Sequence, residues 1–296
     1  MKKQSYPNRW LPLWLALPQL ALVLWFIYWP ASSLIDWSFT LEPPFGGGGR
    51  IFVGWDNFRE IFADPEYARA LRQSLLFSLT APLLSLAAAT ALAICVDRGL
   101  RGAHTCSVLY ILPYAVAAPA AGLAFSFIFS PEAGLLAGLN AWRPGTWDPT
   151  RDSTHAMALL VACFSWKWVG YNFLFLLAGL RAIPRYLLEA AALDGAGPFK
   201  RALDIQLPLL TPSLFFLFVL NLNESLVGPD TFGIIDMTTQ GGPAKATDLL
   251  IYRLVNEAFE GLNYSGSAAQ SLLLVAITVA LAMLQFRVIE RRVHYK

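Results

Sequence analysis

Six long apolar stretches constrain this chain more than any other feature of its sequence. They occupy residues 11–35, 75–96, 105–130, 156–180, 207–229 and 261–286. A helix needs roughly 20 apolar residues to cross the hydrocarbon core of a bilayer. Only 14% of the residues are charged, compared with about 25% in an ordinary soluble domain. The sequence therefore predicts an all-α membrane protein with six transmembrane helices.

The distribution of Lys and Arg between the loops predicts how these helices are oriented. Of the 22 basic residues, 13 fall at the two termini and in the loops on the same side, and 8 fall in the remaining loops. Cytoplasmic loops carry an excess of Lys and Arg, so both termini should be cytoplasmic. The first stretch is too long for a secretory signal and no small-residue cleavage site follows it, which predicts an uncleaved first helix.

The loops on the other side carry turn and capping signals. Prolines and glycines at residues 43–49 indicate a flexible turn. Asp64 precedes Pro65 and is suited to cap a helix that leads into the second span. Residues 249–262 follow a Gly-Gly-Pro turn and have the pattern of an amphipathic helix outside the membrane.

A polar insert at residues 184–208 is longer than a simple connection between two spans requires. Pro184 has the backbone angle suited to the first turn of a helix, and residues 187–193 are good helix formers. Gly195 can adopt a positive φ and end that helix, and Pro198 can begin the next one. The pattern predicts a surface helical hairpin that docks onto another molecule.

This hairpin resembles the EAA loop of type I ABC importer permeases. The family pattern of Glu-Ala-Ala, then Gly, then Ile-x-Leu-Pro matches residues at the same spacing here. They are Glu189, Ala190, Ala191, Gly195, Ile205, Leu207 and Pro208. In that family the loop is the coupling helix, which sits in a groove of the ATP-binding subunit. The resemblance implies that Glu189, Ala190, Ala191, Asp194, Gly195 and Pro208 couple the permease to its ATPase. The alternative is that Glu189 is a solvated carboxylate and the glycines merely end helices.

The same resemblance covers most of the chain, from about Trp10 to Tyr295. Segments 112–117, 171–175, 190–198, 267–271 and 285–287 are similar to the A-type permease subunits of sn-glycerol-3-phosphate importers. The resemblance implies the six-helix permease fold, also called MetI-like, in the inner membrane of a bacterium. It further implies a first transmembrane helix and a periplasmic segment at residues 1–70, a permease core at 71–287 that contains the coupling loop at 184–208, and a cytoplasmic tail at 288–296. One departure is the polar run at residues 223–229, which puts the end of the fifth span in doubt.

The partners implied by the resemblance are a second permease subunit, an ATP-binding subunit dimer and a periplasmic substrate-binding protein. The expected substrate is sn-glycerol 3-phosphate or a glycerophosphodiester. A neutral sugar importer is the alternative within the class, and a non-transport membrane scaffold is the alternative outside it.

The sequence lacks the motifs of several other functions. It contains no Gly-x-x-x-x-Gly-Lys-Ser/Thr motif, so ATP and Mg²⁺ are expected at the partner ATPase rather than on this chain. The three histidines and three cysteines are dispersed, which argues against a hydrolytic centre or a metal site. The basic residues at the membrane edge are explained by orientation rather than by nucleic acid. The chain is therefore not expected to be an enzyme by itself.

Two charged residues interrupt the apolar stretches. Lys167 lies 14 residues before Arg181, and Glu224 lies 17 residues after Leu207. At a rise of 1.5 Å per residue these depths are roughly 21 and 25 Å, so the two side chains could meet. Charges inside a membrane are costly and often functional. Lys167, Asn172 and Glu224 are therefore candidates for the translocation pathway, and the alternatives for Lys167 are an ion pair between helices or a position at the interface.

Overall fold

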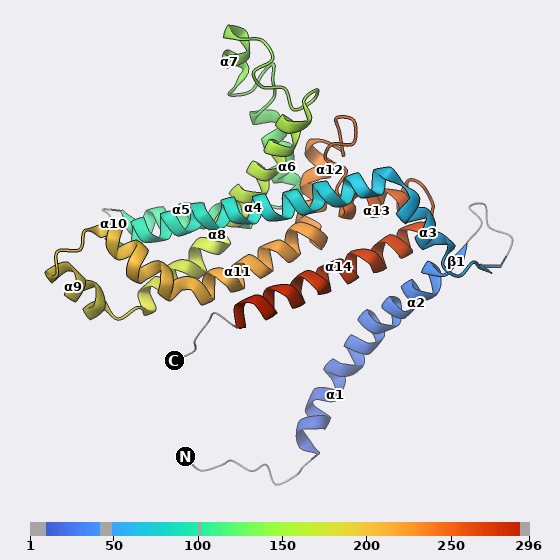
Figure 1. Ribbon diagram of the computed structural model, residues 1–296, viewed down its shortest axis with the longest axis horizontal. Coiled ribbons are helices and arrows are strands. Elements are labelled where there is room, and N and C mark those ends of the chain that lie inside the picture. Colours follow the sequence, from blue (N-terminus) through green and yellow to red (C-terminus); the bar gives the residue numbers. More distant parts are fainter. Residues whose placement is uncertain (1–9, 42–48, 100–101, 291–296) are drawn as a thin grey trace. The chain divides into compact units, whose positions relative to one another are not determined.

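A computed structural model describes residues 10–41, 49–99 and 102–290, and nearly all of its regular structure is helical (Figure 1). Most of the turn expected at residues 43–49 lies outside the described residues, as do most of the basic residues of the two termini. The chain forms two compact units. One comprises Met1–Ala63 with Leu254–Leu273, and the other comprises Asp64–Arg253 with Leu274–Lys296.

In the N-terminal part of the first unit, one long helix is followed by a short packed segment. Helices α1 (Leu11–Val23) and α2 (Trp29–Ser38) are joined without interruption by the π-helical turn η1 (Leu24–Tyr28). Strands β1 (Thr40–Leu41) and β2 (Ile51–Phe52) pair antiparallel, and α3 (Asp56–Ala63) follows. The buried amide of Asn57 donates to the carbonyl oxygens of Ser38 and Thr40, which ties α3 to the end of α2.

Proline explains the π-helical turn in the first helix and a second one later in the chain. Pro30 follows η1 after one residue, and Pro208 likewise follows η2 (Ala202–Gln206) after one residue. A proline has no N–H to donate and its ring collides with the carbonyl one turn earlier. One extra residue in the preceding turn shifts the hydrogen-bond register, so the helix continues through the proline instead of breaking.

The second unit is built around α4 (Pro65–Asp97), α8 (Ser153–Ala182) and α11 (Leu207–Val227). The face of α4 toward its neighbours carries small residues every four positions, and all of them are fully buried. They are Ala81, Ser85, Ala89 and Ala93. Small side chains let helix backbones approach closely in a membrane protein, which explains why α4 packs along α8. Asp64 and Asp152 cap the two helices, and the expectation for Asp64 is confirmed.

The third predicted span is not a straight helix. It consists of α5 (Ala103–Ala115) and α6 (Ala118–Ile128), which meet at an angle of 102°. Pro113 removes a hydrogen-bond donor from the end of α5, and Val116 and Ala117 are extended. By length and composition, the described residues contain five helices able to cross a membrane, or six if this bent pair counts as one.

The remaining helices of this unit are short. Helix α6 packs against α12 (Pro229–Thr238), and glycine permits the contact: a Cβ on Gly122 would lie 3.0 Å from the Cβ of Met237. Helix α7 (Ala137–Trp142) follows α6. The fifth span ends at Val227, two residues before its predicted end, because Gly228 is extended before α12 begins.

Two further helices lie in the C-terminal part of the chain. Helix α13 (Leu250–Phe259) is amphipathic, and α14 (Tyr264–Glu290) is the last long apolar helix. The expectation of an amphipathic helix after the Gly-Gly-Pro turn is therefore confirmed for this segment.

Candidate functional site

The polar insert forms the expected helical hairpin. Helix α9 (Arg185–Leu193) starts after Pro184, and α10 (Pro198–Arg201) starts at Pro198. Gly195 has a φ of +81°. The N–H of Gly195 donates to the carbonyl of Ala192 and the N–H of Ala196 donates to that of Ala191, the pattern of a Schellman C-cap. The local prediction for Gly195 and Pro198 is thus confirmed, and Pro184 serves as the N-terminal boundary residue rather than as a helical residue.

The surface of this hairpin, defined as residues 184–208, combines charge with exposed apolar side chains. Glu189, Ala190 and Asp194 are exposed, and Ala191 is half-buried. Leu193 is 89% exposed and Phe199 is 74% exposed. Large apolar side chains displayed next to charged ones are typical of a surface that another protein covers. The hairpin protrudes beyond the ends of α8 and α11 (Figure 1).

Two arginines that sequence reasoning missed fix the shape of the hairpin. Arg98, just after α4, donates through Nη2 to the carbonyl of Pro198 at 2.8 Å. Arg201 donates through Nη1 to the carbonyl of Leu188 at 3.3 Å, which ties α10 to α9. Gln206 adds a hydrogen bond of 3.4 Å to the carboxylate of Asp97. The bonds of Arg98 and Gln206 connect the hairpin to the end of α4, and the bond of Arg201 holds its two helices together.

Pro208 lies where the hairpin becomes a membrane helix. It follows η2, whose buried residues are Ala202 and Gln206, and it stands in the first turn of α11. Its side chain is exposed. Its contribution to the fold is the register shift described above.

Lys167 lies in the middle of α8, and its ammonium group has three partners. Its Nζ donates to the carbonyls of Tyr114 at 3.2 Å and Val116 at 2.7 Å, at the break between α5 and α6. A carboxylate oxygen of Asp230, at the start of α12, lies 3.4 Å from the same Nζ. The lysine is only 4% exposed. It therefore supplies the donors that the ended helix α5 lacks and joins three helices at one point.

Lys167 and Glu224 could have met by their depths, but in the structure Lys167 pairs with Asp230. Glu224 instead accepts a hydrogen bond of 3.3 Å from the backbone N–H of Asp230. A Cβ on Gly228 would lie 2.0 Å from the carboxylate of Glu224. The glycine thus allows α11 to end and the carboxylate to cap α12. Because of this turn, the acid that reaches Lys167 comes from the start of the next helix.

Asn172 belongs to a closed polar cluster between three helices. Its amide donates to the hydroxyl of Ser85 at 2.9 Å and to the amide oxygen of Asn221 at 3.0 Å. Asn221 donates back to Asn172 at 2.8 Å and to the carbonyl of Leu217 at 2.7 Å. Both asparagines are fully buried. Buried amides that satisfy one another hold α4, α8 and α11 in one register.

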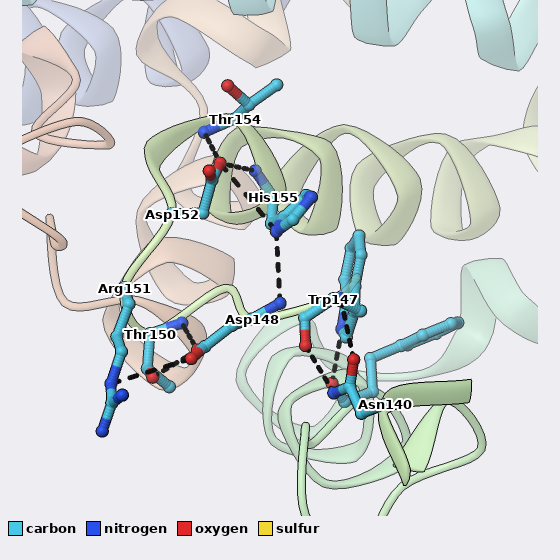
Figure 2. Close-up of polar contacts among 9 residues, drawn as sticks. Asn140, Trp147, Asp148, Thr150, Arg151, Asp152, Thr154 and His155 are labelled. Carbon is cyan, nitrogen blue, oxygen red and sulfur yellow. Dashed lines mark hydrogen bonds and ion pairs between the residues drawn. The ribbon is translucent and has the colours of Figure 1, made fainter. Parts of the chain in front are cut away.

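The segment before α8 is an ordered polar network (Figure 2). Asn140 binds the backbone of Trp147 through both a donor and an acceptor, and the backbone N–H of Asp148 donates to Nδ1 of His155. The N–H groups of His155 and Thr154 lower the pKa of Asp152, because both donate to its carboxylate. Thr150 likewise lowers the pKa of Asp148. The network anchors the connection between α7 and α8.

A second ordered network lies around the Gly-Gly-Pro turn. Arg253 at 17% side-chain exposure pairs with Asp64 at 2.6 Å and with Asp248 at 3.4 Å, and Lys245 pairs with Glu66. Burial raises the pKa of Asp248, and Arg253 opposes that rise. Gln240, Ala244 and Lys245 have positive φ angles. The ion pairs join the turn to the start of α4 and hold these strained residues in place.

Comparison with known proteins identifies the family to which this architecture belongs. Residues 83–295 match the family described as binding-protein-dependent transport system inner membrane component. The chain belongs to this family. It is therefore an integral inner membrane permease of the ABC transporter class, a type of subunit that is not itself catalytic.

Relatives in this permease family match the whole chain. It is 44% identical to the sn-glycerol-3-phosphate transport system permease protein UgpA of Brucella abortus biovar 1 (strain 9-941), over 100% of both chains. It is 43% identical to the protein of the same name from Rhizobium meliloti (strain 1021), again over 100% of this chain.

A solved structure shows the same fold. It is described as a bacterial ABC transporter involved in the import of the acidic polysaccharide alginate. One of its chains aligns with a TM-score of 0.82 at 20% identity and covers 96% of each chain. This likeness establishes the MetI-like permease fold for the chain.

Proposed function

We propose that this chain is a transmembrane subunit of an ATP-driven importer and that it translocates sn-glycerol 3-phosphate or a glycerophosphodiester. The observation that carries the proposal is the 44% identity over the full length of a UgpA protein. The exposed hairpin of residues 184–208 supports the ATP-driven part of the proposal, because it offers a surface for a cytoplasmic partner.

The proposed assembly contains a second homologous permease, a dimer of ATP-binding subunits with their ATP and Mg²⁺, and a periplasmic substrate-binding protein. In it, the permease core is residues 71–287, the bent pair α5–α6 counts as the third of six spans, and both termini are cytoplasmic. The excess of basic residues on the side of the hairpin supports this orientation.

Glu189, Ala190, Ala191, Asp194, Gly195 and Pro208 are proposed to couple ATP hydrolysis to transport. Closure of the ATPase dimer would move α9 and α10, and the Arg98 and Gln206 hydrogen bonds would carry that movement to α4. Alternating access would then open the substrate cavity toward the periplasm.

Lys167, Asn172 and Glu224 remain the proposed pathway residues. Lys167 is occupied by two carbonyls and Asp230, and Asn172 by Ser85 and Asn221. Lys167 would therefore meet the substrate only in a conformation in which α5–α6 or α12 has moved, and Asn172 only in one in which α4 or α11 has moved. An sn-glycerol 3-phosphate molecule carries nearly two negative charges at neutral pH, and a released Lys167 would offset part of that charge.

Uptake of radiolabelled sn-glycerol 3-phosphate tests the proposal. A bacterial strain that lacks its own permease for this substrate should regain uptake when it produces this chain with its neighbouring importer subunits. Glu189→Ala should abolish uptake without reducing the amount of protein in the membrane. Uptake of maltose instead would favour a neutral sugar importer, and failure to co-purify with an ATPase would favour a scaffold.

A further inference from the structure

A groove of about 880 Å³ runs between the starts of α4 and α8. Its polar end carries Arg69, Arg72 and Gln73 of α4, and its apolar end carries Leu76 of α4 with Met157 and Val161 of α8. We propose that this groove, here called the α4–α8 groove, binds the headgroup and upper acyl chain of phosphatidylglycerol.

The two arginines, Arg69 and Arg72, have no acidic partner within the described residues. Both side chains are exposed, and neither makes an ion pair or a side-chain hydrogen bond within the part of the chain that the structure describes. Arg253, also near the start of α4, is engaged with three carboxylates by contrast. Arg69 and Arg72 are three residues apart and so share one face of α4. Two guanidinium groups on one face match a phosphodiester, which accepts paired hydrogen bonds from arginine.

Gln73 supplies a reason to expect a ligand with hydroxyl groups. Its amide oxygen is buried and has no hydrogen-bond partner within the described residues, and such an atom costs free energy unless a donor reaches it. The headgroup of phosphatidylglycerol carries two hydroxyl groups next to its phosphate. One of them can donate to Gln73 while the phosphate lies against the arginines.

The change from polar to apolar lining matches the depth profile of a lipid. Leu76 lies one turn beyond Arg72, and Met157 and Val161 lie one and two turns into α8. These distances correspond to about 6 to 12 Å along a helix, the depth at which headgroup gives way to acyl chain. Thr80 also lines this end, but its hydroxyl donates to the carbonyl of Leu76 within α4. Because sn-glycerol 3-phosphate has no acyl chain to cover the apolar side chains, the groove suits a lipid rather than the proposed substrate.

Native mass spectrometry of the complete importer tests this proposal. The importer is released from nanodiscs that contain phosphatidylglycerol and phosphatidylcholine in equal amounts. We expect the double variant Arg69→Gln, Arg72→Gln to retain phosphatidylglycerol roughly 30-fold less well at this site, because each basic residue near a membrane surface contributes about fivefold. The matched control Arg143→Gln, Arg151→Gln removes two exposed arginines of the α7–α8 connection and should retain the lipid like the wild type.

A second measurement separates the lipid from other occupants. Val161→Cys should react with a maleimide-bearing lipid analogue in the nanodisc. Equal retention of phosphatidylglycerol by wild type and the Arg69→Gln, Arg72→Gln variant would overturn the proposal, as would displacement of the lipid by dissolved sn-glycerol 3-phosphate. Cross-linking of Val161→Cys to the second permease subunit would also overturn it, because the groove would then be a subunit interface. None of these outcomes depends on which substrate the importer carries.

Discussion

At the scale of single residues, Lys167 shows how a buried charge can organise a membrane protein. Its ammonium group donates to the carbonyls of Tyr114 and Val116 at the end of α5, and Asp230 balances its charge. The sequence singled out the lysine because a charge interrupted an apolar stretch. It did not single out Asp230. The polar run at residues 223–229 gave no sign that a new helix would begin there and place the carboxylate of Asp230 beside Lys167 of α8.

We predict an asymmetric result for this pair. Lys167→Met should destabilise the protein by about 3–5 kcal/mol, because Asp230 is left without its partner and two carbonyls lose their donor. Adding Asp230→Asn should recover only part of this loss, since the carbonyls of Tyr114 and Val116 stay unsatisfied. Thermal unfolding of the purified permease in detergent measures both effects. Glu224→Gln is the control, and the pairing with Asp230 is refuted if Glu224→Gln, and not Asp230→Asn, restores stability.

Asp152 supports a prediction about pH. Its pKa is lowered from the ordinary value of 3.8 by the N–H groups that it caps. A lowered pKa means that the ionised form stabilises the folded state, so this contribution is complete above pH 3.8 and is lost as the pH falls through the lowered value. The protection of the Thr154 and His155 amides against hydrogen exchange, relative to their intrinsic rates, should therefore fall in acid. Asp152→Asn should remove most of this dependence, and an unchanged pH profile in that variant would assign it to another group.

At the scale of elements, the sequence predicted straight elements better than bent ones. Apolar length located every long helix, and glycine and proline located the turns of the hairpin. The 102° break between α5 and α6 was missed because both halves are apolar and hydropathy does not report direction. The break depends on Pro113, on the close packing of Gly122 against α12 and on Lys167, which lies some fifty residues further along the chain.

The hairpin provides a prediction with a matched control. Gly195 and Gly197 both have open space where a Cβ would lie, but Gly195 has a φ of +81° and Gly197 a φ of −65°. Gly195→Val should cost about 1–2 kcal/mol in backbone strain and abolish uptake, whereas Gly197→Ala should be tolerated. ATPase co-purification, uptake and membrane content are measured on each variant. If docking of the ATPase and uptake both survive Gly195→Val, the hairpin does not couple the two subunits.

At the scale of the whole molecule, what the sequence could establish was the number of apolar segments and a charge bias. The structure leaves either five or six spans, depending on whether the bent pair crosses the membrane. The two possibilities make opposite statements about every segment after α6. If α5–α6 crosses, residues of α7 lie on the side opposite the hairpin of residues 184–208 and on the same side as Gly49. If α5–α6 re-enters, α7 lies across the membrane from Gly49, and the hairpin shares the side of Gly49.

Cysteine labelling in intact cells distinguishes these two topologies. Cys95, Cys106 and Cys163 are first replaced by Ala, and single cysteines are then introduced as Gly49→Cys, Gly138→Cys and Gly197→Cys. A Cβ at each of these glycines meets no neighbouring atom within 4 Å, so the substitutions should not disturb the fold. A membrane-impermeant maleimide should label Gly49→Cys and Gly138→Cys from outside, and Gly197→Cys only after permeabilisation. Labelling of Gly197→Cys in intact cells would place the hairpin outside. That result would mean that the bent pair α5–α6 turns back within the membrane. The hairpin would then be out of reach of a cytoplasmic ATPase.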